Sequence, residues 1–236
     1  MSEWKTLVFS TLVLSVLCIA SGCGDSATGP NDLNTEWQLV DETDGIATYW
    51  RHRPDSRQKT FRAVGTFPSE QPFAVLEAMA KSDLADFFEG VASVDTFEED
   101  PTGRWVSRAE INLPWPLNDR ELFVETHLRQ DPNTYEAVLS WEDVNERYPD
   151  TAGTQKIPQH RGELRVLPLE GGRVKLTFET VGDPGRMIPA SLTDTFAKSI
   201  PHYALSYMRD LMAQPEYQDY DLPLLDDPGV ETHRRD

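Results

Sequence analysis

The sequence predicts an α+β fold in which one long C-terminal helix covers the dry face of an antiparallel sheet. Two observations lead to this prediction. Residues 187–211 place apolar side chains on one side at helical spacing, and the segments before them alternate between apolar and polar residues. Such a sheet has one dry face, and the helix is the only predicted element long enough to cover it.

The long helix is predicted over residues 187–211, about 37 Å at 1.5 Å per residue. Pro189 suits a first helical turn, because the missing N–H would have no helical partner there. Pro201 falls inside the pattern and predicts a kink. The apolar stripe consists of Ile188, Leu192, Phe196, Ile200, Ala204, Tyr207 and Leu211.

Strands are predicted at 46–51, 59–67, 91–97, 104–113, 120–130, 135–144, 160–167 and 173–181, and a short helix at 71–81. Asp44 and Gly45 form a turn signal between two runs with strand character, the run that opens at Trp37 and the first of these strands. Consecutive strands are expected to pair antiparallel, since that is the simplest connection. Each strand is expected to be apolar on one side only.

The net charge of −18 makes nucleic acid an unexpected partner, because binding phosphate requires a basic face. Adsorption onto an anionic membrane by charge alone is equally unexpected. A content of 39% hydrophobic and 10% aromatic residues is sufficient for a packed core.

The first residues have the pattern of a targeting segment. Lys5 precedes an apolar run over residues 6–19, and small residues lead to Cys23. This pattern resembles the bacterial lipoprotein signal, which implies cleavage after residue 22 and acylation of Cys23. Residues 23–35 then read as a flexible tether. The expected location is therefore the bacterial cell envelope, anchored by lipid and facing the periplasm; a plain secretory signal or a short membrane anchor are the alternatives.

Several stretches together resemble the START (StAR-related lipid transfer) domains. They are Ile111-Asn112-Leu113-Pro114-Trp115-Pro116-Leu117-Asn118-Asp119-Arg120-Glu121, the region 37–50 around Asp44-Gly45-Ile46, the region 161–174, and the segment from Asp183-Pro184-Gly185 to Ile188-Pro189. The resemblance covers about residues 36–213, and it implies a helix-grip fold with an apolar cavity between the sheet and the last helix. Residues 214–236, which are acidic and rich in proline, are predicted to form a disordered tail.

The resemblance implies that the chain binds a lipid or another apolar small molecule, with or without transferring it. The cavity residues expected from the alternation and the resemblance are Trp105, Ser107, Ala109, Ile111, Trp115, Arg120, Leu122, Val124, Thr126, Leu164, Leu176, Phe178, Leu192, Phe196, Ile200, Tyr203 and Tyr207. In this set Trp115 and Arg120 are placed at the mouth, and the interior offers hydroxyls but no fixed positive charge. A neutral or weakly polar ligand is therefore the expectation.

No motif for nucleophilic catalysis, phosphate binding or metal binding occurs in the sequence. The expectation is a monomeric, non-enzymatic protein without cofactor or metal. Two alternatives remain open. A helix-grip enzyme, of the cyclase or hydrolase kind, would be favoured by a buried acid or base with a shifted pKa on the inner face. An envelope interaction module would have a filled core and no cavity.

Overall fold

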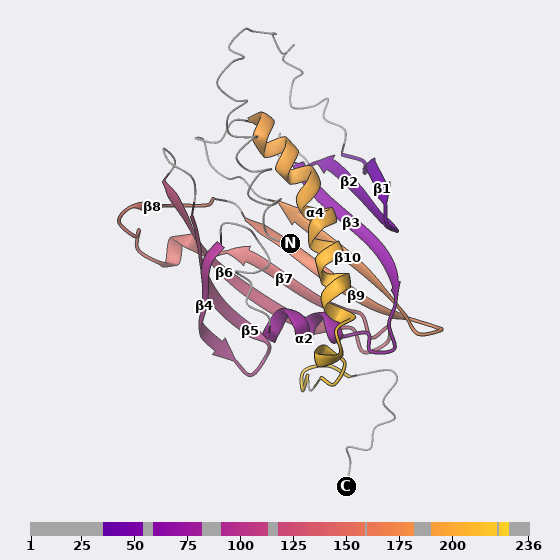
Figure 1. Cartoon of the computed structure of the whole chain (residues 1–236). Helices are drawn as coiled ribbons and strands as arrows, with labels where there is room; N and C mark the ends of the chain where they lie inside the picture. Colours follow the sequence, from indigo (N-terminus) through magenta and orange to yellow (C-terminus); the bar gives the residue numbers. More distant parts are fainter. Residues whose placement is uncertain are drawn as a thin grey trace. The chain divides into compact units, whose positions relative to one another are not determined.

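The computed structural model describes residues 35–53, 59–81, 91–112, 118–158, 160–181, 190–220 and 222–226. Within these residues one ten-stranded sheet runs in the order β1-β2-β3-β10-β9-β7-β6-β5-β4, and β8 pairs with β6 off this path (Figure 1). The strands are β1 (Gln38–Thr43), β2 (Ile46–His52), β3 (Lys59–Pro68), β4 (Val91–Asp100), β5 (Arg104–Ile111), β6 (Asp119–Gln130), β7 (Ala137–Asp143), β8 (Thr154–Lys156), β9 (Arg161–Leu169) and β10 (Arg173–Val181).

The predicted fold class is confirmed, because this large antiparallel sheet packs against a long C-terminal helix, α4 (Ala190–Met212). A shorter helix, α2 (Ala74–Lys81), lies between β3 and β4 in the chain and also packs against α4. Pro201 lies inside α4, as predicted. The predicted start of the helix at residues 187–189 and the segment 183–185 lie outside the described residues.

The strand pairing differs from the expected sequential order at one point. β3 pairs with β10 rather than with β4, and the pairing runs from Arg173 opposite Pro68 to Thr180 opposite Phe61. Local sequence patterns could not predict this pair, since its partners lie more than 100 residues apart and only the closing of the sheet brings them together. The remaining long strands pair with a neighbour along the chain, as expected.

The turn between β1 and β2 forms where the sequence predicted it. Asp44 and Gly45 adopt φ values of 54° and 74°. Positive φ at both central residues suits the right-handed twist of a two-stranded ribbon, and Asp and Gly tolerate it best. β1 is the edge strand that begins at Gln38, in the run with strand character that was predicted before this turn.

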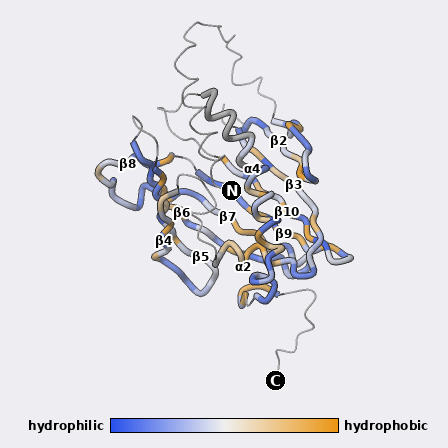
Figure 2. The backbone as a smooth tube through the Cα atoms, in the orientation of Figure 1, coloured by the Kyte–Doolittle hydropathy of each residue, from blue (hydrophilic) through white to orange (hydrophobic). Residues whose placement is uncertain are grey.

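The core lies between α4, α2 and the inner face of the sheet. Helix α4 contacts β2, β3 and β10, and its buried residues Ala204, Leu205 and Met208 join the same apolar cluster as α2. Fully enclosed side chains from the sheet include Ile46, Ala63, Leu164, Val166, Val174 and Leu176. Figure 2 shows hydrophobic segments of α2 and of the strands gathered in this region.

The opposite, outer face of the sheet is not wet throughout, which corrects the expectation of strands apolar on one side only. Val106, Phe123 and Val144 are buried in a second cluster there, with Tyr148 packed against it. The segment 144–158, here called the strap, contains the 3-10 helix η3 (Asn145–Arg147) and β8, and it supplies Val144 and Tyr148 to this cluster. The strap removes part of the outer face from water, so buried apolar residues can occur on both faces of β5 and β6.

The packed domain also extends beyond residue 213, which corrects the prediction of a disordered tail from residue 214. Tyr217, in the 3-10 helix η4 (Pro215–Tyr217), is buried, and Tyr220 lies edge-on to Phe73 at 6.4 Å between ring centres. The backbone of Asp226 exchanges hydrogen bonds with the Gln130 side chain at 2.7 and 2.8 Å. The segment was predicted to be disordered because its few apolar residues lie among many acidic ones, and their return to the core depends on the tertiary structure. Residues 227–236 lie outside the described residues.

Deleting residues 214–236 is expected to lower the melting temperature by about 5 °C or more. Each large apolar side chain removed from the core costs about 1.5–3 kcal/mol, and about 1 kcal/mol shifts the melting point of a domain of this size by about 2–4 °C. Differential scanning calorimetry of the full chain and the two truncations measures the effect. The matched control deletes residues 227–236 only and is expected to melt like the full chain; equal melting of both truncations would contradict the packing role of Tyr217 and Tyr220.

Candidate functional site

The strand register places the predicted inward residues on one face of the sheet. In an antiparallel pair, residues directly opposite each other project to the same side. Ser107 opposes Val124, Ala109 opposes Leu122, and Leu164 opposes Phe178. The inner face of β5, β6, β9 and β10 therefore carries Trp105, Ser107, Ala109, Ile111, Leu122, Val124, Thr126, Leu164, Leu176 and Phe178 together, as the alternation predicted.

Burial divides this inner face into two parts. Leu164, Leu176 and Phe178 are buried beneath the helices, in the part that α4 contacts. Among the inward residues predicted on β5 and β6, Trp105, Ser107, Ala109, Ile111 and Val124 remain half-buried. The inner face over β5 and β6 is thus the apolar surface that the described helices leave partly uncovered.

A row of aromatic side chains crosses this half-buried part. Trp105 opposes Thr126 on β6, and Thr126 in turn opposes Trp141 on β7. The Trp141 ring lies over Gly162 of β9, where a Cβ atom would collide with it, and its centre is 5.6 Å from that of Phe178. The sequence analysis did not assign Trp141; alternation of Ala137, Leu139 and Trp141 along β7 was the signal that could have found it.

Arg120 corrects the expectation of an interior without fixed positive charge. It opposes Ile111 on the inner face and is only 3% exposed, rather than lying at an open mouth. Its guanidinium donates a hydrogen bond to the backbone oxygen of Asn118 at 2.8 Å. A buried guanidinium keeps its charge, so the inner face carries a positive group at the start of β6.

The residues of the long helix that were predicted to line the cavity differ in how far they are buried. Tyr207 is half-buried and packs against the core, in agreement with its place in the predicted apolar stripe; its role in a cavity stays a prediction. Tyr203 is 49% exposed and stacks on Tyr207 at 6.3 Å between ring centres, which corrects its placement as a cavity residue. The side chains of Leu192, Phe196 and Ile200 lie outside the described part of α4, as do Trp115 and Cys23 altogether.

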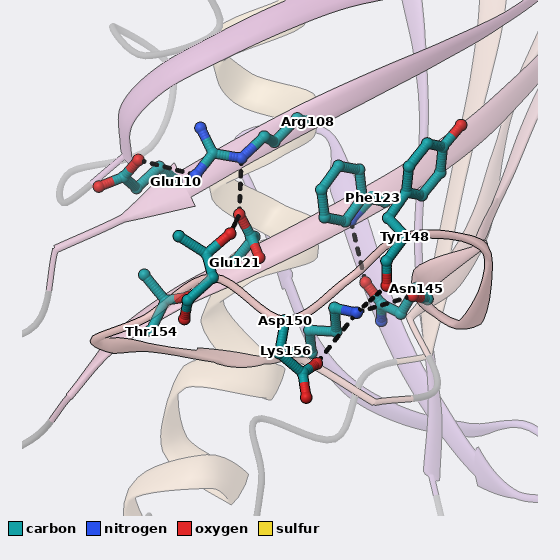
Figure 3. Close-up of polar contacts among 10 residues, drawn as sticks. Arg108, Glu110, Glu121, Phe123, Asn145, Tyr148, Asp150, Thr154 and Lys156 are labelled. Carbon is teal, nitrogen blue, oxygen red and sulfur yellow. Dashed lines mark hydrogen bonds and ion pairs between the residues drawn. The ribbon is translucent and has the colours of Figure 1, made fainter.

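A polar network fixes the start of β6 from the outer face, as Figure 3 shows. Glu121 is fully buried, and its Oε1 accepts hydrogen bonds from Arg108 Nε at 2.6 Å and from Thr151 Oγ1 at 2.8 Å. Lys156 of the strap donates to the backbone oxygen of Asn145 at 2.9 Å. Because neighbouring strand residues point to opposite faces, holding Glu121 outward directs Arg120 inward.

His160 is the one described histidine whose pKa is strongly displaced. Burial lowers its pKa to about 4, and the Asp143 carboxylate opposes this shift. The His160 backbone N–H donates to Asp143 Oδ2 at 3.0 Å, and the Asp143 N–H donates to the His160 carbonyl at 2.7 Å. Asp143 opposes the inward Val124, so this pair continues the inner face beyond the end of β7. The sequence gives no signal for this shift, because the surroundings of an isolated histidine cannot be read from its neighbours in the chain.

Two hollows among the described residues lie on the outer face. One, of about 340 Å³, is lined by Arg104, Glu125, His127, Ser140, Trp141 and Glu142. The other, of about 250 Å³, lies where β2, β3, β10, β9 and β7 adjoin. No helix in the described residues has both the length and the apolar character needed to cross a bilayer. Across those same residues, no group of His, Cys, Asp or Glu side chains is placed to hold a metal ion.

Two solved structures share this arrangement of a large antiparallel sheet and a C-terminal helix. The chain matches a STAR-related lipid transfer protein of Xanthomonas axonopodis with a TM-score of 0.66 and 20% identity, over 75% of this chain and 99% of that one. It matches human StAR-related lipid transfer protein 5 with a TM-score of 0.65 and 13% identity, over 88% and 93%. The fold is START-like.

Sequence comparison adds one relative. An uncharacterised protein of Pseudomonas aeruginosa is 22% identical over 182 residues, which is 76% of this chain and 88% of that protein. No family model matches the chain. The START-like likeness therefore rests on the backbone, and the function has to be argued from the residues of the inner face.

The free energy of unfolding is expected to fall as the pH drops from 6.5 towards 4. In this window the unfolded chain binds a proton at His160 that the folded chain does not, so protonation favours unfolding. The full effect is at most about 3 kcal/mol. Urea unfolding at pH 6.5 and pH 4.5 measures it, and His160→Asn should flatten this dependence. His127→Asn, at a half-buried histidine of the outer face, is the matched control; an equal flattening there would refute the assignment to His160.

Proposed function

We propose that this protein binds a lipid or another apolar small molecule between the inner face of its sheet and α4. The observation that supports this most directly is the half-buried apolar surface over β5 and β6, on a START-like backbone. Trp105, Ala109, Ile111 and Val124 form this surface beside the aromatic ring of Trp141. Apolar side chains aligned on a face that the described helices leave partly uncovered are suited to an apolar ligand.

The energetics favour a ligand with a hydrocarbon part. Each buried CH₂ group is worth about 0.8 kcal/mol, so a chain of about 16 carbons costs roughly 13 kcal/mol to expose to water. A dry internal surface removes most of that cost during transfer between membranes. Arg120 is buried at one end of this surface, where it donates to the Asn118 backbone oxygen, and the Ser107 and Thr126 hydroxyls along the described face are polar groups that a ligand can contact.

The proposal includes a location at the bacterial envelope, with the chain anchored through an acylated Cys23. The apolar run over residues 6–19 and the small residues before Cys23 support it. A lipid anchor would keep the domain beside the membrane that supplies its ligand, and the segment 23–35 would give it reach.

Filling the inner face should abolish ligand binding. Thr126→Trp adds a large ring between Trp105 and Trp141, and it is expected to reduce co-purifying lipid to background in mass spectrometry of organic extracts. The matched control is His127→Trp, since the next residue along β6 projects to the outer face. Lipid retained in Thr126→Trp, or lost equally in His127→Trp, would exclude the inner face as the binding surface.

Replacing Cys23 by Ser should move the protein from the membrane fraction to the soluble fraction, because serine cannot carry the thioether-linked lipid. Fractionation of cells expressing each form, followed by immunoblotting, measures the distribution. If the Cys23→Ser protein stays in the membrane fraction after its first 22 residues have been removed, the lipoprotein assignment is wrong.

A second candidate function is catalysis on an apolar substrate in the same place, and His160 is the observation that favours it. Burial lowers its pKa to about 4, so the imidazole is neutral at pH 7 and a ring nitrogen can accept a hydrogen bond from a ligand hydroxyl. The Asp143 carboxylate is bonded to backbone N–H of His160 and to the side chain of Asn145. Turnover of a bound ligand that His160→Asn abolishes, with binding retained, would support catalysis; equal ligand composition before and after incubation would exclude it.

A further inference from the structure

Residues 222–226, here called the end segment, return to the domain after α4 and η4. Figure 1 shows this part of the chain below α4 and near α2, and η4 contacts α2. Leu222 and Leu225 of the end segment are partly buried and pack against the main apolar cluster. Trp105 of β5 and Leu128 of β6 pack against the same cluster. The end segment therefore belongs to the apolar interior on the inner side of the sheet.

The register places one end of the proposed ligand surface at the same location. Leu128 and Gln130 follow Thr126 at steps of two along β6, so their side chains project to the inner face as that of Thr126 does. Gly103 precedes Trp105 by two residues, and its carbonyl accepts a hydrogen bond from the Leu128 N–H at 2.8 Å. The inner face of β5 and β6 thus continues past Trp105 and ends at these residues.

The end segment closes over this end of the two strands. Leu224 Cδ1 lies 3.0 Å from the position that a Cβ atom on Gly103 would occupy. The Asp226 N–H donates to Gln130 Oε1 at 2.7 Å, and Gln130 Nε2 donates to the Asp226 carbonyl at 2.8 Å. An amide side chain that both donates to and accepts from one residue fixes the position and the direction of the backbone there.

The side of the end segment that faces the sheet is apolar. Leu222 and Leu225 form a tight turn in which the Leu225 N–H donates to the Leu222 carbonyl at 3.0 Å, and both side chains contact the core. A polar ligand group placed against leucine side chains would lose its hydrogen bonds with water and gain none in return. The part of a ligand that reaches the end segment is therefore hydrocarbon.

We infer that the end segment is the closed end of the ligand surface and limits the length of the hydrocarbon chain that fits there. The inference rests on the proposed function and deepens it. The hydrocarbon terminus would lie against Leu225 and Leu128, and the polar group would lie toward Ile111, at the other end of β5. The distance along the strand from Gly103 to Ile111 is about 27 Å at about 3.4 Å per residue, which sets the scale of the limit.

A series of saturated 1-alkanols, from about 12 to about 22 carbons, tests the inference. The full chain is incubated with phosphatidylcholine vesicles that contain an equimolar mixture of the series, and mass spectrometry identifies the alkanols that it retains. Leu225→Ala is expected to raise the upper limit of chain length by about two carbons or more, because the truncated side chain leaves space that a longer chain can occupy.

Two further variants make the test specific. Gln130→Ala releases the end segment without changing its leucines, and it is expected to raise the limit as well. Leu39→Ala truncates a leucine of the edge strand β1 that is 57% exposed, and the limit is expected to stay at the wild-type value. Thermal melting of each variant confirms that it is folded.

The outcomes separate this inference from the proposed function. Alkanols bound with the same upper limit in the wild type, Leu225→Ala and Gln130→Ala would overturn the closed end and leave apolar binding intact. An equal rise of the limit in Leu39→Ala would overturn it too, because the effect would not depend on the end segment. A wild-type chain that retains no alkanol of any length would contradict the proposed function itself, and the inference with it.

Discussion

Burial of the inner face of the sheet under α4 is the interaction on which the rest of this structure depends. Leu205 and Met208 of α4 lie in the same enclosed cluster as Leu176 of β10 and Phe73 beside α2. Removing such a surface from water is the dominant favourable term in folding, and it is proportional to the apolar area covered. A helix of 23 residues cannot cover ten strands equally, so it packs on β2, β3 and β10.

The helices cover the inner face of the sheet unevenly. Over β10 and β9 the inner face is filled by protein, whereas over β5 and β6 it remains half-buried. The same hydrophobic effect that stabilises the first part makes the second part a surface for an apolar ligand. Trp105 and Trp141, on either side of the small Thr126, give this surface its shape.

The strap lies on the outer face of the sheet, and its contacts also determine which side chains of β6 face inward. Its Asn145 accepts a hydrogen bond from the Phe123 backbone at 3.0 Å, and its Thr151 donates one to the buried Glu121. These contacts hold the start of β6 in register, and a slip of one residue would move every side chain of the strand to the other face. The inward direction of Arg120 is therefore determined on the outer face, at a distance from the ligand surface.

The sequence by itself determined the elements and the direction of their side chains, because periods of two and of three to four residues are local properties of the chain. It determined the long helix, nearly all the strands and the inward row from Trp105 to Phe178. Tertiary structure alone decided the pairing of β3 with β10, the return of Tyr217 to the core, the burial of Arg120 and Glu121, and the lowered pKa of His160. Each of these depends on contacts between residues far apart in the sequence, whose closeness follows only from the closed fold.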